Sequence, residues 1–187
     1  MKKLMTPPSL TIEHALLGFL RQQPRHGYEI YQQLSDPNGL WLTWRMKQSQ
    51  LYALLAKLED DGFIVATLQP QETRPPRKVL HLTEIGLAAF LSWVNSPVAH
   101  PRQMRLEFLV KFYFARREGH DLAMSLVEQQ RTLCQSWLIQ QAAQGSGVSD
   151  PQAYAWLVNQ FRVNQIEALI TWLDHCAQSP EMVAVTV

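Results

Sequence analysis

The most constraining feature of the sequence is a series of amphipathic patterns that ends in a change of period. Apolar residues recur at i, i+3, i+4 and i+7, which is the spacing of one face of a helix. Three segments show this spacing: 12–20, 27–34 and 48–61. After Gly62, which can cap the third helix, two short β-forming runs at 63–68 and 78–82 flank a charged loop that contains prolines. The sequence therefore predicts three helices followed by a β-hairpin.

A start signal for a fourth helix follows the hairpin. Thr83 can accept a backbone N–H bond as a cap, and Glu84 in the first turn favours the positive end of the helix dipole. Three helices, a hairpin and a helix in fewer than ninety residues are the layout of a winged helix-turn-helix, in which the third helix enters the DNA major groove. We therefore predict a mainly α fold with a small β-hairpin.

The predicted third helix turns small and polar residues away from its leucine stripe, at 100° per residue. Gln50 can pair bidentately with adenine, and Ala53 can touch a thymine methyl group. Cations before the helix and on the hairpin can bind phosphates. The predicted DNA-contacting residues are Arg45, Lys47, Gln48, Ser49, Gln50, Tyr52, Ala53, Lys57, Arg74, Arg77 and Lys78. An ordinary surface helix and a charged edge strand carry similar residues, so the order of the elements is what favours this interpretation.

The same residues resemble, in order, the pattern of PadR-like transcriptional regulators. The matching motifs are Leu16-Leu17-Gly18-Phe19-Leu20, Pro24, His26-Gly27-Tyr28-Glu29-Ile30, Leu51-Tyr52, Leu54, Leu55, Leu58-Glu59, Gly62, Arg74-Pro75, Arg77-Lys78, Leu82-Thr83-Glu84 and Gly86. Segment 105–114 resembles the start of the longer helical C-terminal region of the virulence-activator-like branch. The resemblance implies a dimeric winged-helix DNA-binding regulator, commonly a repressor, with Tyr52 at the DNA surface, residues 74–78 as the wing, and a dimer made by the C-terminal helices.

Two positions depart from the family's pattern. Leu80 stands where an aromatic residue is usual, and Ser49 stands where the turn before the recognition helix often has a glycine. We expect Leu80 to change only the packing of the hairpin. The departure at Ser49 bears on which base step the helix approaches.

Two prolines and several turn-forming residues at 95–101 divide the chain. We predict a winged helix-turn-helix DNA-binding domain at 1–97 and a helical dimerisation or effector domain at 98–187. Three helices are expected in the second domain. They span about 102–118, about 121–144, and a last segment that begins at Asp150-Pro151, a cap followed by proline at the first helical position.

The last two predicted helices carry more apolar surface than one partner helix would cover. A symmetric dimer would bury the excess and would place two recognition helices about 34 Å apart or at a multiple of that distance. The predicted dimerisation residues are Phe108, Phe112, Trp137, Tyr154, Phe161 and Trp172. A monomeric helical core is the alternative. Aromatic residues in these helices could also line a pocket for a small aromatic effector, although aromatics at helical spacing more often form core.

The sequence lacks the motifs of common enzymes and metal sites. No nucleophile elbow, phosphate-binding glycine loop, zinc helix or paired-cysteine motif occurs, and the six histidines are scattered. His175 beside Cys176 could join a metal or thiol site, but a buried cysteine is usually a small hydrophobe. We therefore expect no enzymatic activity, cofactor or metal.

The prolines near the start and the absence of a long apolar run favour a cytoplasmic location away from the membrane. The first 97 residues hold ten Lys and Arg against eight Asp and Glu. This near balance supports a rival hypothesis, a winged-helix adaptor that binds proteins and not DNA.

Overall fold

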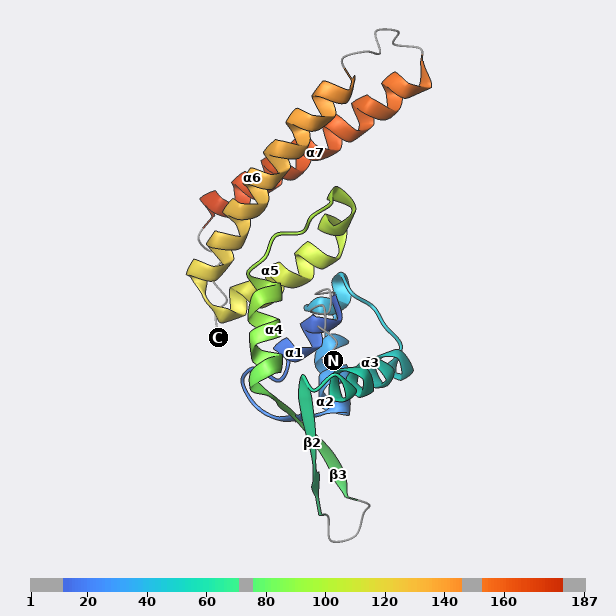
Figure 1. Ribbon diagram of the computed structural model, residues 1–187, viewed down its shortest axis with the longest axis vertical. Coiled ribbons are helices and arrows are strands. Elements are labelled where there is room, and N and C mark those ends of the chain that lie inside the picture. Colours follow the sequence, from blue (N-terminus) through green and yellow to red (C-terminus); the bar gives the residue numbers. More distant parts are fainter. Residues whose placement is uncertain (1–11, 71–75, 146–152, 180–187) are drawn as a thin grey trace, which may run out of the picture. The chain divides into compact units, whose positions relative to one another are not determined.

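The computed structural model of the chain describes residues 12–70, 76–145 and 153–179. It divides into two compact units, Met1–Val94 and Asn95–Val187, and each unit is described by itself (Figure 1). The first is helical with a small three-stranded antiparallel sheet, and the second contains helices only within the described residues. The predicted fold class, a winged helix-turn-helix domain with a helical C-terminal region, is confirmed.

The N-terminal unit has the predicted order of helices and hairpin, with additions. Its elements are the 3-10 turn Ile12–His14, α1 Ala15–Gly18, β1 Arg25–His26, α2 Gly27–Leu34, the 3-10 turn Leu40–Leu42, α3 Gln48–Asp60, β2 Ile64–Gln69, β3 Arg77–Leu82 and α4 Glu84–Val94. The first helix is shorter than predicted, because the bonds around Gly18 are of the tighter i to i−3 kind: Leu20 N–H donates to Leu17 O at 3.0 Å. The apolar stripe from Ala15 to Leu20 is nevertheless largely buried.

Strand β1 is the element that periodicity did not predict. It is two residues long and pairs with β3, with Arg25 opposite Leu80 and His26 opposite Val79, so that the sheet order is β1-β3-β2. A two-residue strand has no alternation to detect, since it is defined by a partner more than fifty residues away. Its consequence is that the start of α2 is tied to the hairpin. Figure 1 shows β2 and β3 extending away from the helices.

The ends of α3 and α4 follow the predicted local chemistry. Gly62 has a φ of 78°, and the next N–H, of Phe63, donates to Leu58 O at 2.9 Å, which closes α3. Thr83 Oγ1 accepts from Gly86 N–H at 3.0 Å and donates to Phe63 O at 3.0 Å. A Cβ on Gly86 would lie 2.0 Å from Phe63 O, so the first turn of α4 packs directly against the backbone of Phe63, just after the end of α3.

The C-terminal unit contains a 3-10 helix and three α-helices: Pro101–Arg105, α5 Glu107–Glu118, α6 His120–Gly145 and α7 Tyr154–Gln178. The predicted single helix over 102–118 is interrupted at Leu106, whose φ and ψ of −128° and −68° are not helical. The predicted start of the last helix at Asp150-Pro151 lies outside the described residues. Helices α6 and α7 run side by side (Figure 1), and Arg131 on α6 bonds Asp174 on α7 at 2.5 Å.

Two of the predicted dimerisation residues, Phe108 and Phe112, belong to the interior of the C-terminal unit. The Phe108 and Phe112 rings each meet Trp172 edge to face, with centroids 6.0 and 6.1 Å away. Phe108 has no exposed surface and Phe112 is buried. Their contact with a second subunit stays a prediction, and within one chain these two rings pack against the interior of the unit. Trp172 and Trp137 are half-buried.

Helix α7 carries apolar residues on two faces, one of them buried and the other exposed. Ile166, Leu173 and Cys176 are buried. Tyr154 and Phe161, from the other stripe, are 81% and 67% exposed. Exposed apolar side chains thus lie on α7, and Ile139 on α6 is also 71% exposed.

Two buried polar side chains hold the segment that begins the C-terminal unit. Lys111 Nζ donates to Ser96 O at 2.9 Å and lies 3.6 Å from the Glu107 carboxylate. Burial lowers the pKa of Lys111, although Glu107 acts in the opposite direction. Gln130, with no exposed surface, accepts from Val98 N–H at 2.7 Å and donates to Val98 O at 3.3 Å. Because each group is bonded where water is excluded, the path of residues 96–98 is fixed.

Within the described parts of the chain, no helix combines the length and apolar character needed to cross a bilayer.

Candidate nucleic-acid interface

Helix α3 has one buried face and one open face, as its leucine spacing predicts. Leu51, Leu55 and Leu58 are buried, whereas Leu54 is half-buried and not fully in the core. The exposed residues of α3 are Gln48, Ser49, Gln50, Tyr52, Ala53, Ala56, Lys57 and Asp60. The exposed side chains at 49, 53 and 56 are small, so the helix backbone can come close to a partner surface along this face.

The N-terminal end of α3 is closed by one of its own predicted contact residues. Gln50 Oε1 accepts the Lys47 N–H at 2.9 Å and so satisfies a backbone donor that the helix leaves free. Bidentate pairing of Gln50 with adenine needs the same oxygen, so it competes with the cap. Arg45, just before the helix, donates from Nε to Trp41 O at 3.2 Å and lies over the Trp41 ring. Arg45 and Lys47 are both exposed.

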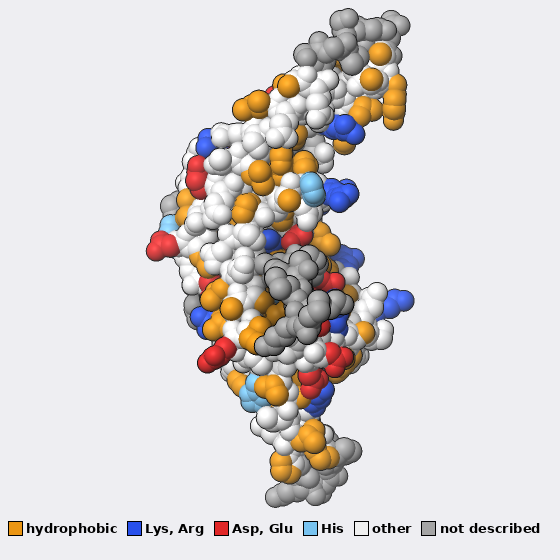
Figure 2. Space-filling model, viewed as in Figure 1, with side chains coloured by type: hydrophobic (Ala, Val, Ile, Leu, Met, Phe, Trp, Pro, Cys, Tyr) orange, Lys and Arg blue, Asp and Glu red, His pale blue; other side chains and the backbone are white. Residues whose placement is uncertain are grey.

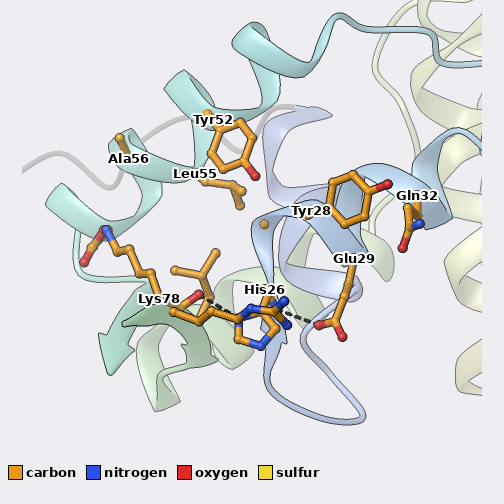
Figure 3. A pocket seen from close by; sticks show the side chains of 12 residues that line it. His26, Tyr28, Glu29, Gln32, Tyr52, Leu55, Ala56 and Lys78 are labelled. Carbon is orange, nitrogen blue, oxygen red and sulfur yellow. Dashed lines mark hydrogen bonds and ion pairs between the residues drawn. The ribbon is translucent and has the colours of Figure 1, made fainter. Parts of the chain in front are cut away.

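Tyr52 leans from α3 onto the start of α2. A Cβ on Gly27 would lie 2.8 Å from Tyr52 Cε1, so the ring takes the space that any other residue at position 27 would need. The Tyr52 side chain is still 45% exposed, and Figure 3 shows its hydroxyl pointing into a hollow between α2 and α3. The contact positions a phenol that can donate a hydrogen bond at the surface.

The hairpin supplies two exposed cations, Arg77 and Lys78, at the start of β3. Lys78 Nζ forms a 2.5 Å ion pair with Glu59 near the end of α3, with the two side chains 54% and 31% exposed. The Lys78 carbonyl accepts from His26 Nδ1 at 3.0 Å. Lys78 is therefore braced to α3 through its side chain and to β1 through its backbone. Arg74, the other predicted hairpin cation, lies outside the described residues.

A hollow of about 740 Å³ joins these elements, and we call it the α3 basin. Its lining includes three predicted contact residues, Tyr52, Arg77 and Lys78. The other lining residues are His26, Gly27, Tyr28, Glu29, Gln32, Leu55, Ala56, Glu59 and Leu80. Figure 3 shows side chains from α2, α3 and β3 around one opening. The remaining predicted contacts on α3 lie along its open face outside this lining.

The basin contains polar groups that the contact prediction missed. Tyr28 is 55% exposed, and Glu29 Oε2 accepts the His26 N–H at 2.7 Å at the start of α2 (Figure 3). The Glu59 carboxylate faces Lys78. Spacing alone signals the His26–Glu29 contact, because a glutamate three residues after a helix start is the second half of a capping box. No local sequence pattern indicates the contact between Glu59 and Lys78, which lie 19 positions apart in the chain.

Within the described ranges, no cluster of three or more His, Cys, Asp or Glu side chains occurs. The arrangement combines three features: a helix face of small residues that fits a DNA groove, the Tyr52 phenol, and the cations Arg77 and Lys78 on β3. Such a combination can contact base edges and phosphates at once. Together with the fold, these features define a winged helix-turn-helix domain.

Comparison with known families agrees with this class. Residues 16–91 match the model described as "Transcriptional regulator PadR-like family". Residues 113–186 match a model described as the leucine-zipper of insertion element IS481.

Individual relatives share parts of the sequence and fold. The chain is 33% identical over 115 residues to the negative transcriptional regulator PadR of Bacillus subtilis. The aligned segment covers 59% of this chain and 62% of that regulator. The match therefore spans less than two thirds of the relative's length. Two crystal structures of Bacillus subtilis PadR are similar at 24% identity. Each comparison covers 91% of this chain and 98% of the other, with TM-scores of 0.46 for the complex with operator DNA and 0.41 for the complex with p-coumaric acid.

Proposed function

We propose that the chain is a repressor of transcription that binds a palindromic operator in double-stranded DNA as a homodimer. The observation that carries this proposal is the exposed, small-residue face of α3 beside the cations of β3. Small side chains let a helix lie deep in the major groove, and cations on its flank neutralise phosphates. The match of residues 16–91 to a family model of transcriptional regulators supports the same function.

The contacts divide into positioning and reading groups. Arg77 and Lys57, both exposed, contact phosphates, and Tyr52 donates to a phosphate or base edge from the α3 basin. Ser49 and Ala53 face the bases, with the Ala53 methyl group against thymine. Asp60 would be repelled by phosphates, so the helix enters the groove with its N-terminal end first.

The proposed dimer forms through the C-terminal unit. Tyr154, Leu157 and Phe161 on α7 are 81%, 52% and 67% exposed, and Ile139 on α6 is 71% exposed. These four large apolar side chains lose contact with water if a second copy covers them. Two-fold symmetry then presents two copies of α3 to one duplex.

The proposed regulation is release from DNA by a small aromatic acid. The Bacillus subtilis relative crystallised with p-coumaric acid supports this class of ligand. Titration of p-coumarate against tryptophan fluorescence, repeated with DNA present, tests it. A fluorescence change that accompanies weaker DNA binding is expected. Unchanged DNA affinity at saturating p-coumarate would contradict the proposed regulation.

An electrophoretic mobility shift with DNA taken from beside the chain's own gene tests DNA binding. The wild-type chain should retain this DNA in preference to a scrambled duplex. Arg77→Gln should weaken binding to both duplexes and lower the salt slope by about 0.9, the value for one phosphate contact. Arg105→Gln, an exposed arginine in the C-terminal unit, is the matched control and should bind like wild type. Absence of any shift would instead favour a protein-binding adaptor.

Light scattering tests the dimer. The wild-type chain, 21.5 kDa as a monomer, should have twice that mass at micromolar concentration. Phe161→Glu should give monomers, because the charge cannot be buried in an apolar interface. Ile85→Glu on α4, where the side chain is 66% exposed, is the control and should remain a dimer. A monomeric wild-type chain would refute the proposed assembly.

A further inference from the structure

The C-terminal unit contains a second hollow, of about 440 Å³, that plays no part in the proposed contacts with DNA. We call it the arginine pocket. Arg102 comes from the 3-10 helix, Gln141 from α6, and Arg162 and Gln165 from α7. His100, Pro101 and Ile166 complete the lining. No carboxylate occurs among these residues, so the pocket gathers positive charge without an acid to balance it.

Most other Lys and Arg side chains of the C-terminal unit contact a carboxylate or an aromatic ring, which sets the two arginines of the pocket apart. From residue 98 onward the sequence has seven Lys and Arg against eight Asp and Glu. Lys111 and Arg131 form ion pairs with carboxylates, and Arg116 and Arg117 lie over aromatic rings. Within the described residues, the three cations of this unit that make no such contact are Arg102, Arg105 and Arg162. Two of these three line the arginine pocket.

The amide groups of the pocket suit the same kind of ligand. Gln141 Nε2 donates to Asn159 Oδ1 at 2.7 Å, which fixes the amide between α6 and α7 while its second N–H stays available. Gln165 is half-buried and supplies a further amide. Ile166, with 3% of its surface exposed, forms an apolar wall. Figure 2 shows Lys or Arg side chains and a histidine close together along one edge of the C-terminal unit.

We propose that the arginine pocket binds a small dianion, such as a phosphate monoester or a dicarboxylate, between Arg102 and Arg162. A planar guanidinium presents paired N–H donors that match the oxygens of a phosphate or carboxylate. Two guanidiniums facing one hollow favour a ligand with two negative charges. The volume lies within the range of small-molecule sites.

This ligand differs in chemistry from the aromatic effector proposed above. His100 is the only aromatic residue of the lining, so the pocket has few faces on which a phenolic ring could stack. Recognition therefore depends on charge. The inference does not depend on DNA binding and can be tested without DNA.

Calorimetric titration of the full chain with inorganic phosphate and, separately, with succinate tests the pocket and distinguishes the two oxygen chemistries. Sodium chloride at matched ionic strength is the reference. We expect saturable binding of at least one of the two dianions, and Arg102→Gln and Arg162→Gln should each weaken it by about tenfold or more. Arg105→Gln removes a cation of the same 3-10 helix that does not line the pocket and should leave binding unchanged.

Thermal unfolding provides the second measurement, because phosphate also stabilises proteins without binding a site. That general effect should be equal in all variants. The part caused by the site, a rise in Tm of about 2 °C or more, should be present in wild type and Arg105→Gln and absent from the other two variants. Equal stabilisation of all four chains would overturn the proposal.

Discussion

Replacing Glu59 with glutamine should release Lys78 to bind DNA. In the structure the Glu59 carboxylate lies 2.5 Å from Lys78 Nζ at the rim of the α3 basin. The two side chains are 31% and 54% exposed, so the pair contributes only about 0 to 1 kcal/mol to stability. Glu59→Gln keeps the side-chain length and removes the charge, and the folded structure should persist.

The magnitude follows from counterion release. One additional contact between a lysine and a phosphate steepens the slope of log K against log salt by about 0.9. Between 200 and 50 mM salt the advantage of Glu59→Gln over wild type should therefore grow by about threefold to fourfold. The gain should be similar for specific and random DNA, because phosphates carry no sequence information.

Fluorescence anisotropy with a labelled duplex at four or five salt concentrations measures the slope. Asp60→Asn is the matched control, since it removes the same charge one residue away, where the described structure contains no ion pair. It should strengthen binding through weaker general repulsion but leave the slope near that of wild type. Equal slopes for Glu59→Gln and Asp60→Asn would refute the argument that the ion pair withholds Lys78 from DNA.

Three further predictions concern the folded state. Gly86→Ala should lower the free energy of unfolding by about 2 to 3 kcal/mol, against the usual gain for this change in a helix, because the new Cβ would meet Phe63 O at 2.0 Å; urea unfolding measures it, and a stabilised variant would contradict it. Gln50→Ala should cost about 0.5 to 1 kcal/mol by removing the cap on α3, whereas Gln48→Ala should cost less; equal losses in urea unfolding would argue against the cap. Because burial lowers the pKa of Lys111, the unfolded chain binds more protons than the folded chain between that lowered pKa and about 10.4. The free energy of unfolding of wild type, relative to Lys111→Met, should therefore rise with pH through this window. Parallel pH profiles of the two chains in urea unfolding would contradict the prediction.

Local chemistry made much of the N-terminal unit predictable. The end of α3 at Gly62 and the start of α4 at Thr83 depend on neighbouring residues, and both were placed from sequence. The exposed face of α3 followed from its leucine spacing. The resemblance to PadR-like regulators depended on the same residues, and the family match confirms it.

Contacts between distant segments were not predictable in the same way. The pairing of His26 with β3 and the ion pair of Glu59 with Lys78 join residues 19 to 53 positions apart, and periodicity carries no information about them. The sequence predicts that Gln50 reads a base, whereas in the structure this first-turn glutamine caps α3.

The C-terminal unit shows a second limit of pattern reading. An apolar stripe indicates that a helix face will be covered but not which surface covers it. Phe108 and Phe112 are covered within their own unit, whereas Phe161 stays exposed. Only the structure separates these two cases.

The most direct test of the account is selection of bound duplexes from a random DNA pool by the wild-type chain. Two copies of α3 related by a two-fold axis should enrich an inverted repeat whose half-site centres lie about 10 to 10.5 base pairs apart, or a multiple of that spacing. Enrichment of a single asymmetric site, or of no sequence at all, would contradict the claim that this chain reads DNA as a symmetric pair.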